Sequence, residues 1–597
     1  MKKTVRLWER IKGVSGAGLR FPATTAFLVA AGIVVAVSIA TEEFYPRILW
    51  AYGVGAMLCA ALQVSWERFF QKVLSRILLM AAGVLLTGGY YLIIRGASEM
   101  SLELGVRTSV ALLALFFAFL WVPVIRSKVS FNESFMVVFK AFFHAMLYAA
   151  VLFAGCSLII TAIDQLIVNI SEKPMMYMAD IVYIVLMPVF FLSLIPRYPG
   201  KDQEMLADEI KVSREEKIGK AAACPKFLEI LLSYIVIPLT AVFTLILILY
   251  IVRNIGGRFW TDNLLEPMLV SYAIVVILVY LLVSRLTNKL AVFYRRVFPK
   301  ILVPIVLFQV AASILNLQNT GMTHTRYYVI LFGIFAAVTG ILLSILDVKR
   351  NGVVAALLIG FSLFSIIPPM DAFTVSRVSQ TRQLEKILTV NDMLKDDQVI
   401  PNPEIGDDVK RQIASTVQYL ANMKYTERIT YLPKDFDVYK DFSDVFGFQA
   451  YDYPKMERNK YVYVSFNRSV SFEVSGYDVA VRGFIPNMIQ NGEKPETCRV
   501  VWEGETYTLK PENQGGVYHM ILEDSKGDLL ADFDTSEVSD RYRSFAVDKS
   551  AMTPEEATFL TENDRVRMAF VVQEANLELS YEQESYYTDY IILIDFK

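Results

Sequence analysis

Eleven long, mostly apolar runs follow one another in the first 367 residues, separated by short polar segments. An apolar run of about 18 residues is long enough to cross a bilayer as a helix. In lipid the backbone must satisfy its own hydrogen bonds, and a helix does so within one segment. The pattern therefore predicts a polytopic α-helical membrane bundle of about eleven transmembrane helices. The expected spans are Pro22–Ala40, Ile48–Trp66, Ile77–Ile94, Thr108–Ile125, Ala145–Ile163, Met178–Ile195, Phe227–Val252, Leu264–Val283, Ile301–Leu317, Tyr327–Leu346 and Gly352–Ile367.

The pattern changes after Pro368 and Pro369. Residues 377–394 are polar with helical spacing and predict a neck helix, and residues 395–408 contain two prolines and a glycine, which predict a linker. Apolar residues then recur at helical spacing from Val409 to Leu420. We expect four regions: a basic N-terminus at 1–20, the bundle at 21–370, the neck helix and linker at 371–408, and a soluble domain at 409–597.

The last part of the chain alternates apolar and polar residues with a period of two, which is typical of strands. The soluble domain is therefore predicted to be a β-rich α+β fold, with a sandwich as one form. Thr553, Pro554 and Glu556 have the pattern of a capped helix start. The expected strands are Tyr461–Phe466, the alternation at Val470, Phe472 and Val474, then Cys498–Leu509, Val517–Leu522, Asp528–Phe533, Arg565–Leu579 and Tyr586–Phe596, with hairpin turns at 514–516 and 525–527.

Basic residues are distributed unevenly among the loops. If the N-terminus is inside, the inside segments carry 25 Lys and Arg residues and the outside loops carry seven. Cytoplasmic loops normally carry this excess. The bias predicts an odd number of spans, with the N-terminus inside and the C-terminal domain outside.

Composition narrows the function classes. The 597 residues are 54% hydrophobic, and their net charge of −2 conceals a net charge of +13 before residue 371 and of −15 from residue 371 onward. The basic residues lie in short loops between apolar runs, so they indicate the lipid bilayer as partner and not a nucleic acid. With three His and four Cys residues in the chain, we expect no His-rich metal site, no disulfide framework and no cofactor.

Three stretches resemble a known family. Thr320–Val329 (Thr-Gly-Met-Thr-His-Thr-Arg-Tyr-Tyr-Val) introduces the tenth span, Phe373–Leu384 follows the last span, and Ser475–Asp478 lies in the strand region. They are similar to the bacterial multi-pass membrane proteins grouped as domain-of-unknown-function family 4153. The resemblance implies a bacterial cell-envelope protein of the cytoplasmic membrane, and the family supplies no catalytic residues to carry over.

Polar residues in or near the spans are the candidate sites, because a charge in the bilayer is costly and is often functional. Lys140 and His144 share one helix face and could form a proton or anion site, or Lys140 could reach the interface with His144 one turn deeper. Gln309 lies nearest to the middle of a predicted span, with Ser313 and Asn316 on a similar helix face. The ordinary role of such residues is an interhelical hydrogen bond, and a substrate path is the alternative. The remaining candidates near span ends are Glu229, Glu266, Asp164 and Asp180, and Arg326 could hold a phosphate or carboxylate or be an ordinary interfacial arginine.

For other polar groups the sequence context favours simpler roles. Glu42 and Glu43 lie in a loop that is too short to build the site of a lipid-linked glycosyltransferase. The Asp528, Asp532 and Asp534 run does not have the spacing of an EF-hand, so a solvated strand face is expected, and His519 belongs to an alternating strand. The C-terminal region contains no glycine-rich phosphate loop and no serine nucleophile elbow.

Three function classes remain. The first is a non-enzymatic envelope protein whose outside domain binds glycans, lipids or proteins, with the bundle as anchor or signal path. The second is a secondary transporter or channel, for which proline-broken spans and Gln309 are suitable. The third is a membrane enzyme that acts on lipid-linked substrates. No catalytic residue is assigned.

Overall fold

The computed structural model describes residues 15–70, 72–96, 101–167, 171–200, 208–254, 265–450, 460–466, 470–485, 497–514, 517–543, 551–579 and 585–597. The chain divides into two compact units, Met1–Ala450 and Tyr451–Lys597. Each unit is described separately.

Within the described residues of the first unit, eleven helices are long and apolar enough to cross a membrane, which agrees with the number of predicted spans. Nine spans are single helices, and the sixth and seventh are each built from three consecutive pieces that include a π-helical turn. The nine are α2 (Pro22–Thr41), α3 (Pro46–Phe69), α4 (Val73–Arg95), α5 (Leu102–Trp121), α6 (Phe131–Leu166), α12 (Leu265–Val283), α13 (Lys289–Thr320), α14 (His324–Ile345) and α15 (Gly352–Ile366), and the composite spans are α7 (Lys173–Asp180) with η2 (Ile181–Leu186) and α8 (Met187–Ser193), and α10 (Lys226–Ile230) with η4 (Leu231–Val236) and α11 (Ile237–Asn254).

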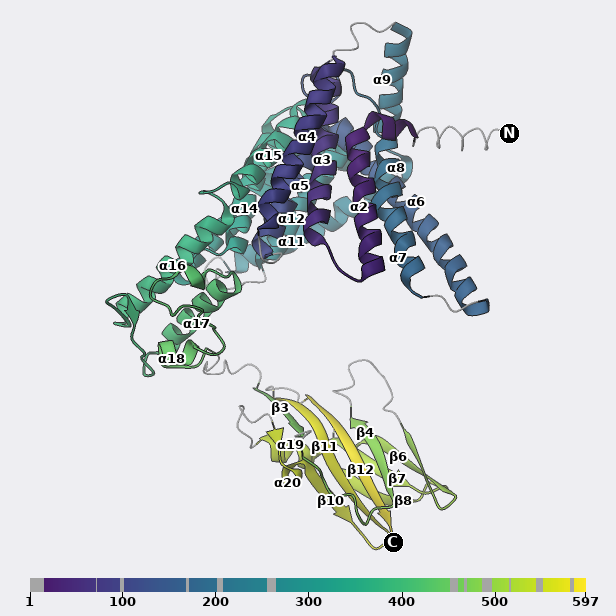
Figure 1. Ribbon diagram of the computed structural model, residues 1–597, viewed down its shortest axis with the longest axis vertical. Helices are drawn as coiled ribbons and strands as arrows, with labels where there is room; N and C mark the ends of the chain where they lie inside the picture. The colour runs from purple at the N-terminus through teal and green to yellow at the C-terminus, as the bar shows by residue number, and fades with distance from the viewer. Residues whose placement is uncertain are drawn as a thin grey trace. The chain divides into compact units, whose positions relative to one another are not determined.

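The two ends of the bundle differ (Figure 1). Helix α9 (Asp208–Ala222) lies at one end, and α16 (Ala372–Val390), α17 (Asp407–Asn422) and α18 (Phe442–Phe446) lie at the other. We call these the α9 end and the α16 end. The expected linker contains a small hairpin, β1 (Leu394–Lys395) with β2 (Gln398–Val399). The compact unit continues to Ala450, past the boundary expected at residue 409, because α17 packs against α16.

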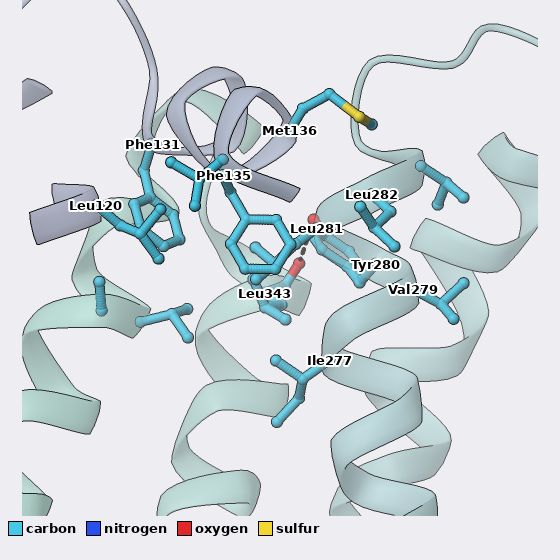
Figure 2. Packing of buried hydrophobic residues seen from close by; sticks show 14 of the residues in the cluster. Leu120, Phe131, Phe135, Met136, Ile277, Val279, Tyr280, Leu281, Leu282 and Leu343 are labelled. Carbon is cyan, nitrogen blue, oxygen red and sulfur yellow. Dashed lines mark hydrogen bonds between the residues drawn. The ribbon is translucent and has the colours of Figure 1, made fainter. Parts of the chain in front are cut away.

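An apolar core joins the helices at the α9 end (Figure 2). Phe131 and Phe135 of α6 pack beside Leu120 of α5, with Tyr280 of α12 and Leu343 of α14 close by. The Tyr280 hydroxyl donates a hydrogen bond to the Leu343 carbonyl at 3.3 Å, so this buried polar group is satisfied. This packing and the Tyr280–Leu343 hydrogen bond hold α6, α12 and α14 against one another.

A buried ion pair closes the bundle at the same end. Arg20 donates two hydrogen bonds to the Glu67 carboxylate at 2.7 and 2.8 Å, and both side chains are nearly buried. Gln63 donates a further hydrogen bond to Glu67 at 3.0 Å, and Arg76 in turn donates to Gln63 at 3.0 Å. The network connects α3, α4 and the residues that precede α2, so charges at this end are paired and not left bare in lipid.

The second unit contains two antiparallel-rich sheets (Figure 1). A six-stranded sheet has the order β4-β12-β11-β3-β9, with β10 also paired to β11, and a four-stranded meander has the order β5-β6-β7-β8. The strands are β3 (Lys460–Phe466), β4 (Val479–Ile485), β5 (Cys498–Trp502), β6 (Glu505–Gln514), β7 (Val517–Glu523), β8 (Leu529–Asp534), β9 (Ala551–Met552), β10 (Thr558–Glu562), β11 (Val566–Leu579) and β12 (Ser585–Phe596), accompanied by α19 (Ser536–Arg543) and α20 (Pro554–Ala557).

The two sheets pack face to face as a β-sandwich, as expected. Phe533 of β8 stacks on Phe570 of β11 with ring centroids 4.0 Å apart, and Trp502 of β5 stacks on Phe596 of β12 at 5.0 Å. The predicted turn at 525–527 is confirmed, with Gly527 at a φ of +88°, whereas Gly515 and Gly516 lie outside the described residues. The capping box of Thr553 and Glu556 is confirmed as well.

Two strand predictions are wrong. The expected strand Cys498–Leu509 is divided into β5 and β6 by a turn at Glu503 and Gly504, where Gly504 has a φ of +87°. Val470, Phe472 and Val474 form no strand, because this segment has no hydrogen-bonded neighbour strand and β4 begins only at Val479. The alternation reflects a loop in which Phe472 turns inward and packs against Phe466 at 5.7 Å.

Candidate functional site

Two of the three stretches that carry the family resemblance meet at the α16 end. Thr320–Val329 covers the end of α13 and the start of α14, and Phe373–Leu384 forms the first part of α16. Tyr419 of α17 completes the contact. We call the contacts among these two stretches and Tyr419, together with the Asp371–Arg107 ion pair at the start of α16, the neck joint.

An ion pair begins α16. Asp371 is the N-cap residue, and its carboxylate accepts hydrogen bonds from the backbone N–H groups of Phe373 and Thr374, both at 3.1 Å. Arg107 of α5 donates to the same oxygen at 2.6 Å. Burial would raise the pKa of Asp371, but the hydrogen bonds from Thr374 and the Arg107 guanidinium hold it below its usual value. The carboxylate is therefore charged at neutral pH and fixes α16 to α5.

His324, the first residue of α14, lies between two aromatic rings. Its imidazole stacks on Phe373 at 5.4 Å and on Tyr419 at 5.8 Å. The backbone N–H of His324 donates to the Tyr419 hydroxyl at 3.0 Å, and that hydroxyl lies 2.9 Å from Nδ1 of the same histidine. Since the hydroxyl already accepts one hydrogen bond, its own proton can point to Nδ1, which favours the neutral ring with its proton on Nε2.

Amide groups close the neck joint. The Gln380 side chain donates to the carbonyls of Thr320 at 2.9 Å and Met322 at 3.3 Å, and the Met322 N–H donates to Ser379 Oγ at 2.9 Å. Gly321 has a φ of +67°, and a Cβ there would lie 2.8 Å from Gln380 Nε2. This close approach needs glycine for both its conformation and its size.

A second group of polar residues lies next to the joint and includes three of the predicted site residues. Ser313 of α13 donates to the Glu266 carboxylate at 2.7 Å, and Glu266 interacts electrostatically with Arg326. Arg326 also hydrogen-bonds to Thr320 and to the Gly321 carbonyl. Gln309, one helical turn from Ser313, is 1% exposed, and neither atom of its amide has a hydrogen-bond partner among the described residues.

The other predicted site residues lie elsewhere. Lys140 donates to the Ala223 carbonyl at 2.6 Å, and His144 Nδ1 lies 2.7 Å from the Lys140 carbonyl, so the two share a helix face as expected. Glu229 of α10 accepts a hydrogen bond from Asn288 at 3.1 Å. These residues are at the α9 end and do not join the group around Glu266.

The other polar residues, for which the sequence predicts simpler roles, contact nearby side chains or backbone groups. Glu42 pairs with Lys173 at 2.9 Å, and Glu43 accepts a hydrogen bond from Tyr45 at 2.6 Å. In the second unit His519 lies 2.8 Å from Asp532, and Asp534 accepts from the Ser536 N–H. Within the described residues, no group of three His, Cys, Asp or Glu side chains could hold a metal ion.

Asp180 is buried inside the bundle and was predicted only as a span-end residue. It is 6% exposed, and its Oδ1 has no hydrogen-bond partner among the described residues. A Cβ added to Gly32 would lie 3.5 Å from this oxygen, and Gly32 is near the middle of α2. The carboxyl group therefore lies beside the middle of α2, one of the candidate membrane spans.

Sequence reasoning missed several residues of the neck joint. Asp371 before Ala372 and Phe373 has the pattern of an N-cap, which is a usable signal. Nothing in the spacing connects it with Arg107, which is 264 residues earlier, or connects Tyr419 with His324. His324, Ser379 and Gln380 use their polar groups in contacts inside the protein, which makes the joint a structural contact, whereas Arg382 and Gln383 of the same stretch line a cavity of about 520 Å³.

Replacing Gly321 with alanine tests the neck joint. Its backbone conformation is nearly exclusive to glycine, so alanine should cost about 1–3 kcal/mol, and hydrogen exchange along Ala372–Val390 should become faster in the purified protein. The matched control is Gly105→Ala on α5, where nothing lies within 4 Å of an added Cβ. Equal exchange in both variants would contradict the described contact.

Comparison with known proteins gives one family. The family model described as a domain of unknown function (DUF4153) matches residues 25–402, which is more than half of the chain. The matched region includes all the spans and both stretches of the neck joint, whereas Ser475–Asp478 lies beyond it. No curated protein and no solved structure matches the chain. The chain belongs to the DUF4153 family of multi-spanning membrane proteins.

Proposed function

We propose that the chain is a non-enzymatic cell-envelope protein of the bacterial cytoplasmic membrane. In this proposal the bundle anchors an extracytoplasmic C-terminal domain that binds envelope glycans, lipids or proteins. The neck joint then fixes α16 and α17 to the bundle and forms the mechanical start of the connection to that domain.

The neck joint is the observation that carries the proposal. The stretches Thr320–Val329 and Phe373–Leu384 contact each other and hold α16 against the ends of α13 and α14. His324, Ser379 and Gln380 all have hydrogen-bond partners inside the protein. A substrate path or a catalytic centre would instead leave polar groups directed toward open space. The arrangement favours a structural connection between membrane and domain.

Charge supports the orientation. The loops that carry the large basic excess belong to the α9 end, and the helices of the neck belong to the α16 end. By the positive-inside rule the α9 end is cytoplasmic, so α16 begins outside. The second unit contains 15 Lys and Arg against 27 Asp and Glu residues, so a partner with cationic groups is favoured.

A single-cysteine labelling experiment tests the orientation. One variant keeps only Cys498, in the second unit, and its control keeps only Cys224, in the segment between α9 and α10. A membrane-impermeant maleimide should label Cys498 in intact spheroplasts and label Cys224 only after lysis. Labelling of Cys224 in intact spheroplasts, with Cys498 protected until lysis, would reverse the orientation and remove the proposed envelope ligand.

A second candidate function is transport, and one set of observations favours it. Asp180 is a buried carboxyl group beside the middle of α2, directly before the π-helical turn Ile181–Leu186. The next span has a π-helical turn of equal length at Leu231–Val236, and each turn is followed by one residue and then a proline, Pro188 or Pro238. Broken spans with π turns often mark sites of ion or substrate passage.

Proton flux into vesicles separates the two candidates. If the chain transports, reconstituted wild type should carry protons above the level of empty vesicles, and Asp180→Asn should abolish that flux because it removes the titratable group. Asp347→Asn, in an exposed loop, is the matched control and should keep it. Under the envelope-binding proposal all three preparations carry no more protons than empty vesicles.

A further inference from the structure

A cavity of about 750 Å³ opens at the α9 end, away from the neck joint. Its walls are the connection between α5 and α6 on one side and the corner before α15 on the other. The charged side chains that line it are Arg126, Lys128, Glu133, Arg285, Lys349 and Arg350, and the aromatic ones are Trp121 and Phe131.

The cavity is strongly basic. Five cationic side chains line it, and Glu133 is the one carboxylate among the lining residues. Glu133 is already neutralised, because Arg285 lies 2.8 Å from it and both the N–H and the hydroxyl of Ser130 donate to it. Among the described residues, the remaining four cations have no acidic residue in the cavity wall to balance them, although Lys128 lies 3.9 Å from Glu215 outside it.

The walls are held in place before any ligand arrives. Asn132 of α6 donates to the Val348 carbonyl at 3.1 Å, and Asn351 donates to Asn132 at 3.3 Å, so the corner before α15 is fixed to α6. A Cβ on Gly352 would lie 2.8 Å from Trp121 Nε1, which shows how closely α15 approaches α5. The first residues of both α6 and α15 border the cavity, and helix N-termini favour anions.

Apart from Ser127 and Ser130, the remaining lining is apolar. Phe131, Val124 and the 41% exposed Val353 belong to the same cavity. Figure 2 shows Phe131 and Phe135 packed in the apolar core of the bundle beside it. The cationic rim would bind the charged headgroup of a lipid, and the apolar surface beside it would contact the acyl chains. A soluble anion would use the cationic rim alone.

We propose that this cavity binds the phosphate group of an anionic phospholipid headgroup. Arginine forks match phosphate oxygens in geometry, and lysines add point charge. The acyl chains of the lipid would then lie along the apolar residues that border the rim. The site is independent of the proposed envelope ligand.

Native mass spectrometry of the full-length protein in neutral detergent tests this site, with phosphatidylglycerol, phosphatidylcholine and inorganic phosphate as probes. Wild type should retain phosphatidylglycerol in preference to phosphatidylcholine. Lys349→Gln with Arg350→Gln should weaken phosphatidylglycerol binding roughly ten-fold or more, since each basic residue contributes about 1 kcal/mol near a charged lipid. A second pair on the opposite wall, Arg126→Gln with Lys128→Gln, should have the same effect.

A charge-matched control separates the cavity from general surface attraction. Arg296→Gln with Lys300→Gln removes two exposed cations of α13 and should leave phosphatidylglycerol binding unchanged. Equal losses in the control and in both cavity pairs would overturn the site. Binding of inorganic phosphate with no preference for phosphatidylglycerol would overturn the lipid assignment and identify a soluble phosphate as the ligand.

Discussion

Charged groups in or next to a bilayer must be paired or must reach water, and this constraint organises the bundle. At one end Glu67 receives two hydrogen bonds from Arg20, and both side chains are close to buried. At the other end the fully buried Asp371 pairs with Arg107. Breaking either pair would leave an unbalanced charge in a region of low dielectric, so each pair also determines which helices are neighbours. Asp180 is the described exception, which is why it supports the transport alternative.

The Asp371–Arg107 pair has a consequence beyond stability. It starts α16 at a defined place, and the stacked His324 and the Gln380 amide then hold the helix along its first turns. The neck is therefore a continuation of the bundle and not a tether. This explains why the first compact unit extends to Ala450, and why the two family stretches are close in space although one precedes α14 and the other follows α15.

The sequence predicts what depends on local pattern. Apolar length locates the eleven spans, and Thr553 with Glu556 locates a helix start, because both signals lie within a few residues. Sequence-based prediction fails where a contact with a segment distant in the sequence determines the structure. Val470, Phe472 and Val474 alternate like a strand but have no partner strand among the described residues. Glu266 meets Ser313 and Arg326 only because α12, α13 and α14 pack. The cavity bordered by Arg126 and Lys349 joins segments more than 200 residues apart.

The central claim is that the neck is fixed to the bundle. The most direct test is an electron–electron distance measurement between spin labels at Leu102→Cys on α5 and Lys386→Cys on α16, both exposed, in a chain otherwise free of cysteine and reconstituted in nanodiscs. A fixed neck gives one narrow distance distribution. A broad or multiple distribution would show that α16 moves relative to α5 and would contradict the joint as the connection between membrane and C-terminal domain.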